Sequence, residues 1–196
     1  MQEYTAQEKG NVMLPIRLGG PPLADFNQPL EMLHDCHRRI EHFLDVFKRV
    51  AQQFSDSELN EEGRRALEAS LTYFSQAAPR HTADEEQSLF PRMRTSADPV
   101  VQAALAELDS LEADHRTAEE LHEKVDALGR HWLRAGRLTE EEMTRFQAWL
   151  DELAAIYAAH IRMEEERVFV MAAQALSAEE LQEVGAEMRK RRRIAP

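Results

Sequence analysis

The chain has 196 residues and a formal net charge of −12 at pH 7, because 36 acidic residues outnumber 24 Lys and Arg residues. This length suits one domain or two small ones with a substantial core, and the negative charge argues against a broad nucleic-acid-binding surface. Only seven glycines and eight prolines occur, and Ala, Glu, Leu and Arg dominate, so the local conformational preference is helical.

The pattern of cysteine and apolar residues predicts a cytoplasmic protein. Cys36 is the only cysteine, so no internal disulfide can form, which suits a reducing compartment. Residues 1–13 lack the basic start and apolar core of a secretory signal. No apolar run approaches the roughly 20 residues that a membrane span requires.

Residues 1–26 form an N-terminal arm that shows no helical periodicity. Its glycines and prolines are Gly10, Pro15, Gly19, Gly20, Pro21 and Pro22. Its apolar residues alternate instead, at Val12, Leu14, Ile16 and Leu18. Two interpretations stay open for this arm: it lies against the rest of the protein or a partner subunit, or it is disordered.

The first helix is expected to begin near Asn27, with Pro29 in its first turn. Its apolar residues recur at alternating steps of three and four, which is typical of a helix buried along one stripe. The stripe reads Leu30, Leu33, His37, Ile40, Leu44, Phe47, Ala51, Phe54. His37 should therefore point into the core.

The second helix follows 55–57 and places Leu67, Leu71, Phe74, Ala78, His81, Glu85 and Ser88 on one stripe. Pro79 should kink this helix, because proline removes a hydrogen bond and crowds the preceding turn. Pro91 should end it, with a connector at 95–99.

Two further long helices and a short one complete the predicted architecture. The third helix runs over 100–135 and stops at Gly136, and Thr139 with Glu142 forms a capping box that starts the fourth. Ser177 and Glu180 repeat this signal for a short last helix that ends in the basic run 189–193. The sequence thus predicts an all-α, antiparallel up-down-up-down four-helix bundle at 27–175, with a C-terminal helix and basic tail at 176–196.

The same pair of polar residues occurs on the buried stripes of helices two and four. His81 precedes Glu85 by four residues, and His160 precedes Glu164 by four, so each pair lies on one helical face. The other two helices each carry a lone histidine, His37 in the first and His115 in the third. The two halves of the chain therefore have the same order at nearly the same spacing: His115 follows His37 by 78 residues, and His160 follows His81 by 79. An antiparallel bundle would bring these groups together as a pseudo-twofold cluster of four histidines and two carboxylates.

Such a cluster predicts a metal centre. An unpartnered buried amide or hydroxyl costs about 1–3 kcal/mol, and an isolated carboxylate costs more, whereas a metal ion takes up the lone pairs and neutralises the charge. Mixed imidazole and carboxylate ligands suit iron, manganese or zinc, and carboxylates that bridge two ions inside a bundle are the di-iron arrangement. A structural zinc site would more often use cysteine.

Other polar residues lie near these positions in the sequence. His42 and His131 should lie off the buried stripe, and Cys36 should be structural. His122 is two turns beyond His115, too far to share an ion. Four residues stay open as additional ligands or contacts of the site: His34, Glu41, Glu119 and Glu165.

The chain resembles the hemerythrin-like, or HHE cation-binding, family over roughly residues 28–175. The segments that show the resemblance are Asp35-Cys36-His37-Arg38-Arg39-Ile40, His81 to Pro91, Glu112-Ala113-Asp114-His115 and His160 to Glu165. The resemblance implies a non-haem di-iron centre, carboxylate-bridged with an oxo or hydroxo group. Its implied ligands are His37, His81, Glu85, His115, His160 and Glu164, with Glu85 and Glu164 bridging.

Two departures move the resemblance toward bacterial members. Invertebrate oxygen carriers have a histidine where this chain has Glu119, and they place their last carboxylate where it has Glu165. Bacterial members react with oxygen, peroxide or nitric oxide, or supply iron for the repair of iron–sulfur centres, but the repair members have an N-terminal cysteine pair that is missing here.

We therefore expect a di-iron protein that binds or senses oxygen, peroxide or nitric oxide, rather than a dedicated enzyme. The seam residues Leu111, Tyr157 and Phe74 should line the approach of this ligand. Iron storage or delivery without redox turnover, and a metal-free interaction module, are the alternatives. We expect no nucleic-acid or membrane partner, a possible homodimer, and a solvated basic tail whose cations favour the end of their helix.

Overall fold

The computed structural model describes residues 24–194, which contain helices and no strand. The expectations for the first 23 residues lie outside this range. In chain order the helices are α1 (Pro29–Gln53), α2 (Glu61–Gln76), α3 (Ala78–Asp84), η1 (Glu85–Leu89), α4 (Phe90–Thr95), α5 (Pro99–Ala103), α6 (Leu105–Ala135), α7 (Glu140–Met163), η2 (Glu164–Val168), α8 (Phe169–Ala175) and α9 (Ala178–Arg191).

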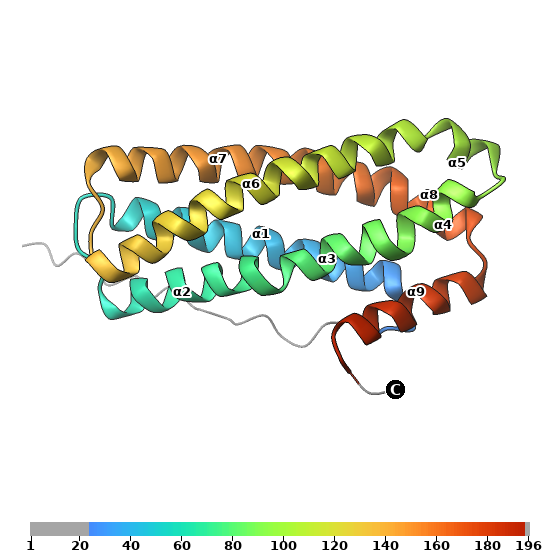
Figure 1. The fold of residues 1–196 in the computed structure, drawn as a ribbon, viewed down its shortest axis with the longest axis horizontal. Helices are drawn as coiled ribbons and strands as arrows, with labels where there is room; N and C mark the ends of the chain where they lie inside the picture. The colour runs from blue at the N-terminus through green and yellow to red at the C-terminus, as the bar shows by residue number, and fades with distance from the viewer. Residues whose placement is uncertain (1–23, 195–196) are drawn as a thin grey trace, which may run out of the picture.

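These helices build a four-helix bundle with a fifth helix at one end, which confirms the predicted all-α fold (Figure 1). The four long members are α1, the succession α2–α3–η1–α4, α6, and the succession α7–η2–α8. Successive members run in opposite directions, and α1 packs against α2 and α7 while α6 packs against the same two helices. No helix in the described range is long and apolar enough to cross a membrane.

Local sequence signals start and end these helices as predicted. Pro29 lies in the first turn of α1. Backbone N–H groups in the first turn have no acceptor inside the helix, so the lack of an N–H in proline costs no hydrogen bond there. Thr139 and Ser177 each form a capping box that begins α7 and α9. Gly136 ends α6 with a φ of 80°, a conformation that costs glycine little because it has no Cβ.

The bundle holds two apolar clusters, one toward each end. One includes Phe47, Leu71, Trp132 and Phe146, and the other includes Leu33, Phe90, Leu111 and Val168. Each long helix passes from one cluster to the other at a polar residue of the predicted centre. The burial pattern therefore places a polar layer between two apolar layers, where access of bulk water is restricted.

The expected interruption of the second helix by Pro79 is confirmed, because the break falls at Ala77, in the turn before the proline, and Pro79 lies in the first turn of α3. Two expected helix boundaries were wrong. Pro91 does not end the second helix, because α4 continues to Thr95. Pro91 is the second residue of α4, just after a π-helical turn where the register changes, and a proline is tolerated in the first turn of the next α-helical segment. The third helix is also broken at Ala104, between α5 and α6.

The C-terminal helix α9 packs across α1, α3 and η1 (Figure 1). Gly185 permits this approach, since a Cβ there would lie 1.8 Å from the carbonyl oxygen of Phe26. Arg191 and Arg192 both form ion pairs with Asp84, whose side chain is fully buried. The expectation of a solvated basic tail was therefore wrong for these two arginines, because a buried carboxylate outcompetes solvent as their partner.

Candidate metal centre

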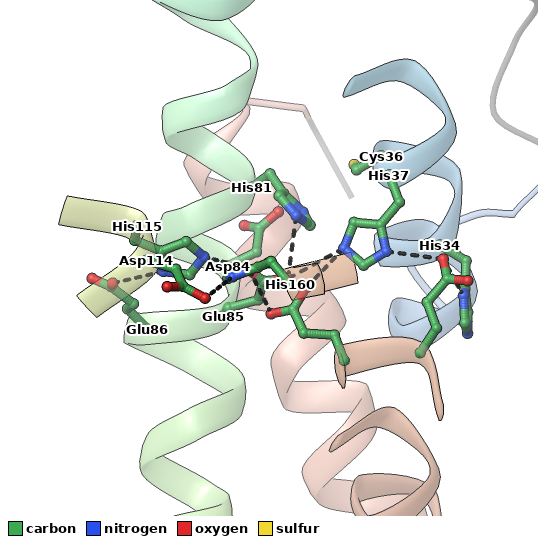
Figure 2. A network of polar contacts seen from close by, with 12 residues as sticks. His34, Cys36, His37, His81, Asp84, Glu85, Glu86, Asp114, His115 and His160 are labelled. Atoms are coloured by element: carbon green, nitrogen blue, oxygen red, sulfur yellow. Dashed lines mark hydrogen bonds and ion pairs between the residues drawn. The ribbon is translucent and has the colours of Figure 1, made fainter. Parts of the chain in front are cut away.

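Six side chains from the four long helices meet in the polar layer (Figure 2). His37 comes from the middle of α1 and His115 from α6. The two His-x-x-x-Glu pairs come from the remaining members, each with its histidine in an α-helix and its glutamate as the first residue of a π-helical turn. The structure thus brings together the six residues predicted from the sequence: His37, His81, Glu85, His115, His160 and Glu164.

All four imidazole rings present Nε2 to the two glutamates. Glu164 lies 3.0 Å from His37 Nε2 and 3.3 Å from His160 Nε2. Glu85 lies 3.3 Å from His81 Nε2 and 3.4 Å from His115 Nε2. The donor atoms therefore converge on one small volume.

These donor atoms fall into two groups that share both carboxylates. His37 and His81 form one group with Glu85 and Glu164, and His115 and His160 form the other with the same two glutamates. In each group the ligand atoms lie within 4.8 Å of one another. Two adjacent ions could each take two imidazoles and share two carboxylates.

The glutamates are fully buried, and none of their four side-chain oxygens has a hydrogen-bond partner of suitable geometry among the described residues. Burial, followed by the neighbouring Glu164, raises the pKa of Glu85 well above its usual range. For Glu164, burial also opposes ionisation, but the adjacent imidazoles of His160 and His37 hold its pKa below the usual range. Unpaired buried oxygens are costly, and cations between these groups would satisfy them.

A carboxylate fixes the orientation of three of the four imidazoles from outside the cluster. Glu165 Oε1 accepts from His37 Nδ1 at 2.9 Å, and Glu86 Oε1 accepts from His115 Nδ1 at 2.9 Å. Asp114 Oδ2 lies 3.4 Å from His160 Nδ1. A proton held on Nδ1 leaves the Nε2 lone pair directed inward, as a metal ligand requires.

The fourth ring, His81, has no partner for its Nδ1 among the described residues. Burial, followed by the nearby His37, lowers the pKa of His81 well below its usual value. For His37 and His160 burial also opposes protonation, but the neighbouring Glu164 raises their pKa values. Neutral imidazole is the form that binds metal, so His81 is already in that form and a metal ion would displace any proton on His37 and His160.

Residues left open or set aside by the sequence fall outside the inner cluster. Glu41 and Glu119 are exposed and join no group of potential ligands in the described chain. His34 instead shares Glu165 with His37, through Nδ1 at 2.9 Å. His131 lies on the half-exposed surface, 3.6 Å from Glu142.

Cys36 and His42 lie near the centre in sequence but outside the cluster. Cys36 is buried, and burial raises the pKa of its thiol to about 11, so it stays a protonated thiol at neutral pH. His42 packs edge-on against Phe43, with ring centroids 5.2 Å apart. Neither residue joins a group of potential ligands among the described residues, which agrees with the structural role expected for Cys36 and with the expectation that His42 is not a ligand.

A cavity of about 470 Å³ opens beside His115, between α2–α3 and α6. Phe74 and Tyr157 line it, as the sequence predicts, whereas Leu111 does not and belongs instead to the apolar cluster at the other end. His122 joins Tyr157 here through a 2.8 Å hydrogen bond. The cavity extends to the outer edge of the cluster.

Sequence reasoning missed the outer carboxylates Glu86 and Asp114 and the two π-helical turns. A signal for Glu86 was present, because the doubled glutamates Glu85-Glu86 and Glu164-Glu165 stand at matching places in the two halves. Each second glutamate serves the lone histidine of the opposite half. That exchange becomes visible only once the helices are packed.

Comparison with known proteins agrees with this architecture. Residues 28–172 match the family described as the hemerythrin HHE cation binding domain. An uncharacterized protein of Haemophilus influenzae is 32% identical over 172 residues, which cover 87% of this chain and 94% of the relative. The matched range contains all six residues of the cluster and covers the four long members except for the last three residues of α8. The chain belongs to the hemerythrin HHE cation-binding family.

Proposed function

We propose that the cluster holds two iron ions and that the protein binds or reacts there with a small ligand such as oxygen, peroxide or nitric oxide. The observation that supports two ions best is the sharing of Glu85 and Glu164 by two separate groups of ligand atoms. A single ion would leave one histidine pair without a partner. Iron fits the mixed imidazole and carboxylate donors, and none of the grouped residues is a cysteine.

The protein's own residues would determine how such a centre behaves. Two histidines and the two shared glutamates would hold each ion, and four protein ligands would leave room at the ion for a small molecule. Bound iron would supply the redox chemistry and that open position. Four imidazole ligands beside only two carboxylates would make the site less anionic than a carboxylate-rich one, which favours the ferrous state.

The surrounding side chains control access to the centre. The apolar clusters above and below it include Phe47 and Phe90, which are buried and exclude bulk water. A cytoplasmic location is part of the proposal, supported by Cys36 being the only cysteine of the sequence, so that no internal disulfide can form. Neither Glu119 nor Glu41 joins the groups of protein ligands. This supports ions that keep a position open for a small molecule over ions whose positions are all filled by protein side chains.

Stopped-flow absorption of the reduced protein mixed with oxygen tests this function. We expect a coloured species to form and then decay to a resting ferric spectrum that argon purging does not reverse. A fully reversible spectrum would indicate an oxygen carrier, and no reaction at all would favour iron storage or a structural ion. His160→Ala removes a histidine of the cluster and is the test variant. His131→Ala is its matched control, because His131 lies outside the cluster beside Glu142, and it should react like the unmodified protein.

A further inference from the structure

The cavity beside His115 is much larger than a small inorganic ligand requires. Its volume of about 470 Å³ lies within the range of roughly 300–1,000 Å³ that is typical of pockets for organic molecules. One water molecule accounts for only ~30 Å³ of liquid. The cavity therefore has room for an occupant with several carbon atoms.

The inner wall of this cavity is largely apolar. Phe47, Leu71, Phe74 and Val125 line it, and each is buried in the apolar cluster at that end of the bundle. Phe74 is held between two rings: it stacks on Phe47 at 5.5 Å and on His122 at 4.4 Å between ring centroids. These contacts fix the shape of the wall, so that the cavity is preformed.

One hydrogen-bond donor faces this apolar surface. His122 Nε2 and Tyr157 Oη are 2.8 Å apart, and His122 Nδ1 is buried with no partner among the described residues. A buried N–H without an acceptor is rarer than an unpaired lone pair, so the proton belongs on Nε2, which donates to Tyr157. The hydrogen of the tyrosine hydroxyl is then free to donate to a molecule in the cavity.

The inner part of the cavity carries no net charge. Burial lowers the pKa of His122 to about 4, so its ring is neutral at pH 7, and Tyr157 keeps its proton because burial raises its pKa. At the rim, Asp126 is paired with Arg130 at 2.8 Å, and Glu86 is paired with His115. Asp126 pairs through Oδ2, and its Oδ1 is buried with no partner among the described residues. Glu119, Glu123 and the cation Arg116 are exposed at the rim, so solvent screens all three, and the acidic groups outnumber this one cation and disfavour anions.

We propose that this cavity binds a small uncharged organic molecule, with an apolar body and one oxygen that accepts a hydrogen bond from Tyr157. The body would lie against Phe74 and Val125, and the oxygen would lie at the Tyr157–His122 pair. This binding site goes beyond the proposed iron function and does not depend on which metal the cluster holds, since every contact that defines it comes from the protein.

Four single-ring probes test the proposal by ligand-observed NMR titration of the protein as purified: benzyl alcohol, toluene, benzoate and benzylammonium. Benzyl alcohol should bind more tightly than the two charged probes. Tyr157→Phe should weaken benzyl alcohol binding about fivefold, the effect of one hydrogen bond, and leave toluene binding unchanged. Equal weakening of both probes would mean that the hydroxyl makes no such bond and would overturn the proposal.

A second pair of variants tests whether binding occurs in this cavity. Ser75 lies at the exposed rim, and Ser75→Trp should block entry and lower benzyl alcohol affinity at least tenfold. Thr144→Trp is the matched control. Thr144 is exposed, and its hydroxyl donates to a carbonyl one turn earlier on its helix, as the hydroxyl of Ser75 does. Thr144 lies outside the cavity. Undiminished binding to Ser75→Trp, or tighter binding of benzoate or benzylammonium, would refute the site.

Discussion

The two outer glutamates show how a single residue acts on the centre without entering it. Glu86 and Glu165 each accept from the Nδ1 of a lone histidine at 2.9 Å. Each stands one residue after a shared carboxylate, so the two halves of the bundle exchange equivalent contacts. Their role is to hold the tautomer and ring orientation of His115 and His37.

We predict that Glu86→Gln and Glu165→Gln each weaken metal binding roughly tenfold, because the imidazole loses its anionic partner. Competition with a chromogenic chelator measures the affinity. Glu166→Gln is the control, since Glu166 is exposed in the same helix turn and should leave affinity unchanged. A loss in one half only would contradict the pseudo-symmetric assignment.

His122 should make the stability of the metal-free protein depend on pH. Its pKa falls from 6.5 to about 4 in the folded state because of burial, so below pH 6.5 the unfolded chain binds the extra proton and folding becomes less favourable. Between pH 7 and pH 5 this residue should remove about 2 kcal/mol from the free energy of unfolding. His122→Gln should flatten the pH dependence of urea unfolding by that amount, and identical curves would refute the shift.

At the residue scale, the sequence predicted the inner cluster better than its surroundings. Helical spacing alone places His81 and Glu85 on one face, and packing four helices side by side brings the matching faces together. The spacing of residues along one helix cannot identify Asp114 as a partner of His160, because that contact depends on how far α6 and α7 are shifted along each other. Long-range contacts of this kind need the packed structure.

At the scale of elements, the two π-helical turns change how each His-x-x-x-Glu pair is presented. Each turn begins at a shared glutamate, Glu85 or Glu164, and widens the helix where the carboxylate enters the cluster. Such turns often mark functional sites. The sequence predicted that each pair lies on one helix face, but it did not predict the change of register. A segment of five residues is too short for its pattern of apolar residues to distinguish a π-helical turn from an α-helical one.

The packing of α9 onto the bundle depends on a buried ion pair. Asp84 is fully buried beside Glu85, and Arg191 and Arg192 are its partners. Replacing both arginines by glutamine would leave this carboxylate buried without a countercharge. We predict a loss of about 3–5 kcal/mol in the free energy of unfolding, the usual effect of breaking a buried pair.

Urea unfolding of two double variants measures this effect. Arg191→Gln with Arg192→Gln should be destabilised, whereas Lys190→Gln with Arg193→Gln should stay within about 0.5 kcal/mol of the unmodified protein, because both of these residues are exposed. Equal stability of the two double variants would mean that the tail is solvated, as the sequence alone indicated.

At the scale of the whole molecule, the fold was predictable because its signals are repeated and local. Capping boxes at Thr139 and Ser177, a stop at Gly136 and seams of alternating three and four residues each specify a helix end or a buried face. The placement of α9 was not predictable, since it depends on Gly185 meeting the backbone of Phe26. That contact joins residues from opposite ends of the chain.

The same whole-molecule view explains why the centre lies where it does. Each long helix changes from apolar to polar and back along its buried stripe, and the antiparallel arrangement aligns these changes between the two apolar clusters. The polar layer is costly in the absence of cations, because Glu85 and Glu164 hold unpaired buried oxygens. Metal binding should therefore contribute directly to folding stability.

Iron content per chain tests the central claim most directly. Elemental analysis after anaerobic reconstitution with ferrous iron and removal of the excess should give two iron ions per chain. His81→Ala and His160→Ala should each lose much of this iron, while His42→Ala and His131→Ala should retain it. One firmly bound zinc with no iron uptake, or equal loss in all four variants, would contradict a di-iron centre built from these histidines and glutamates.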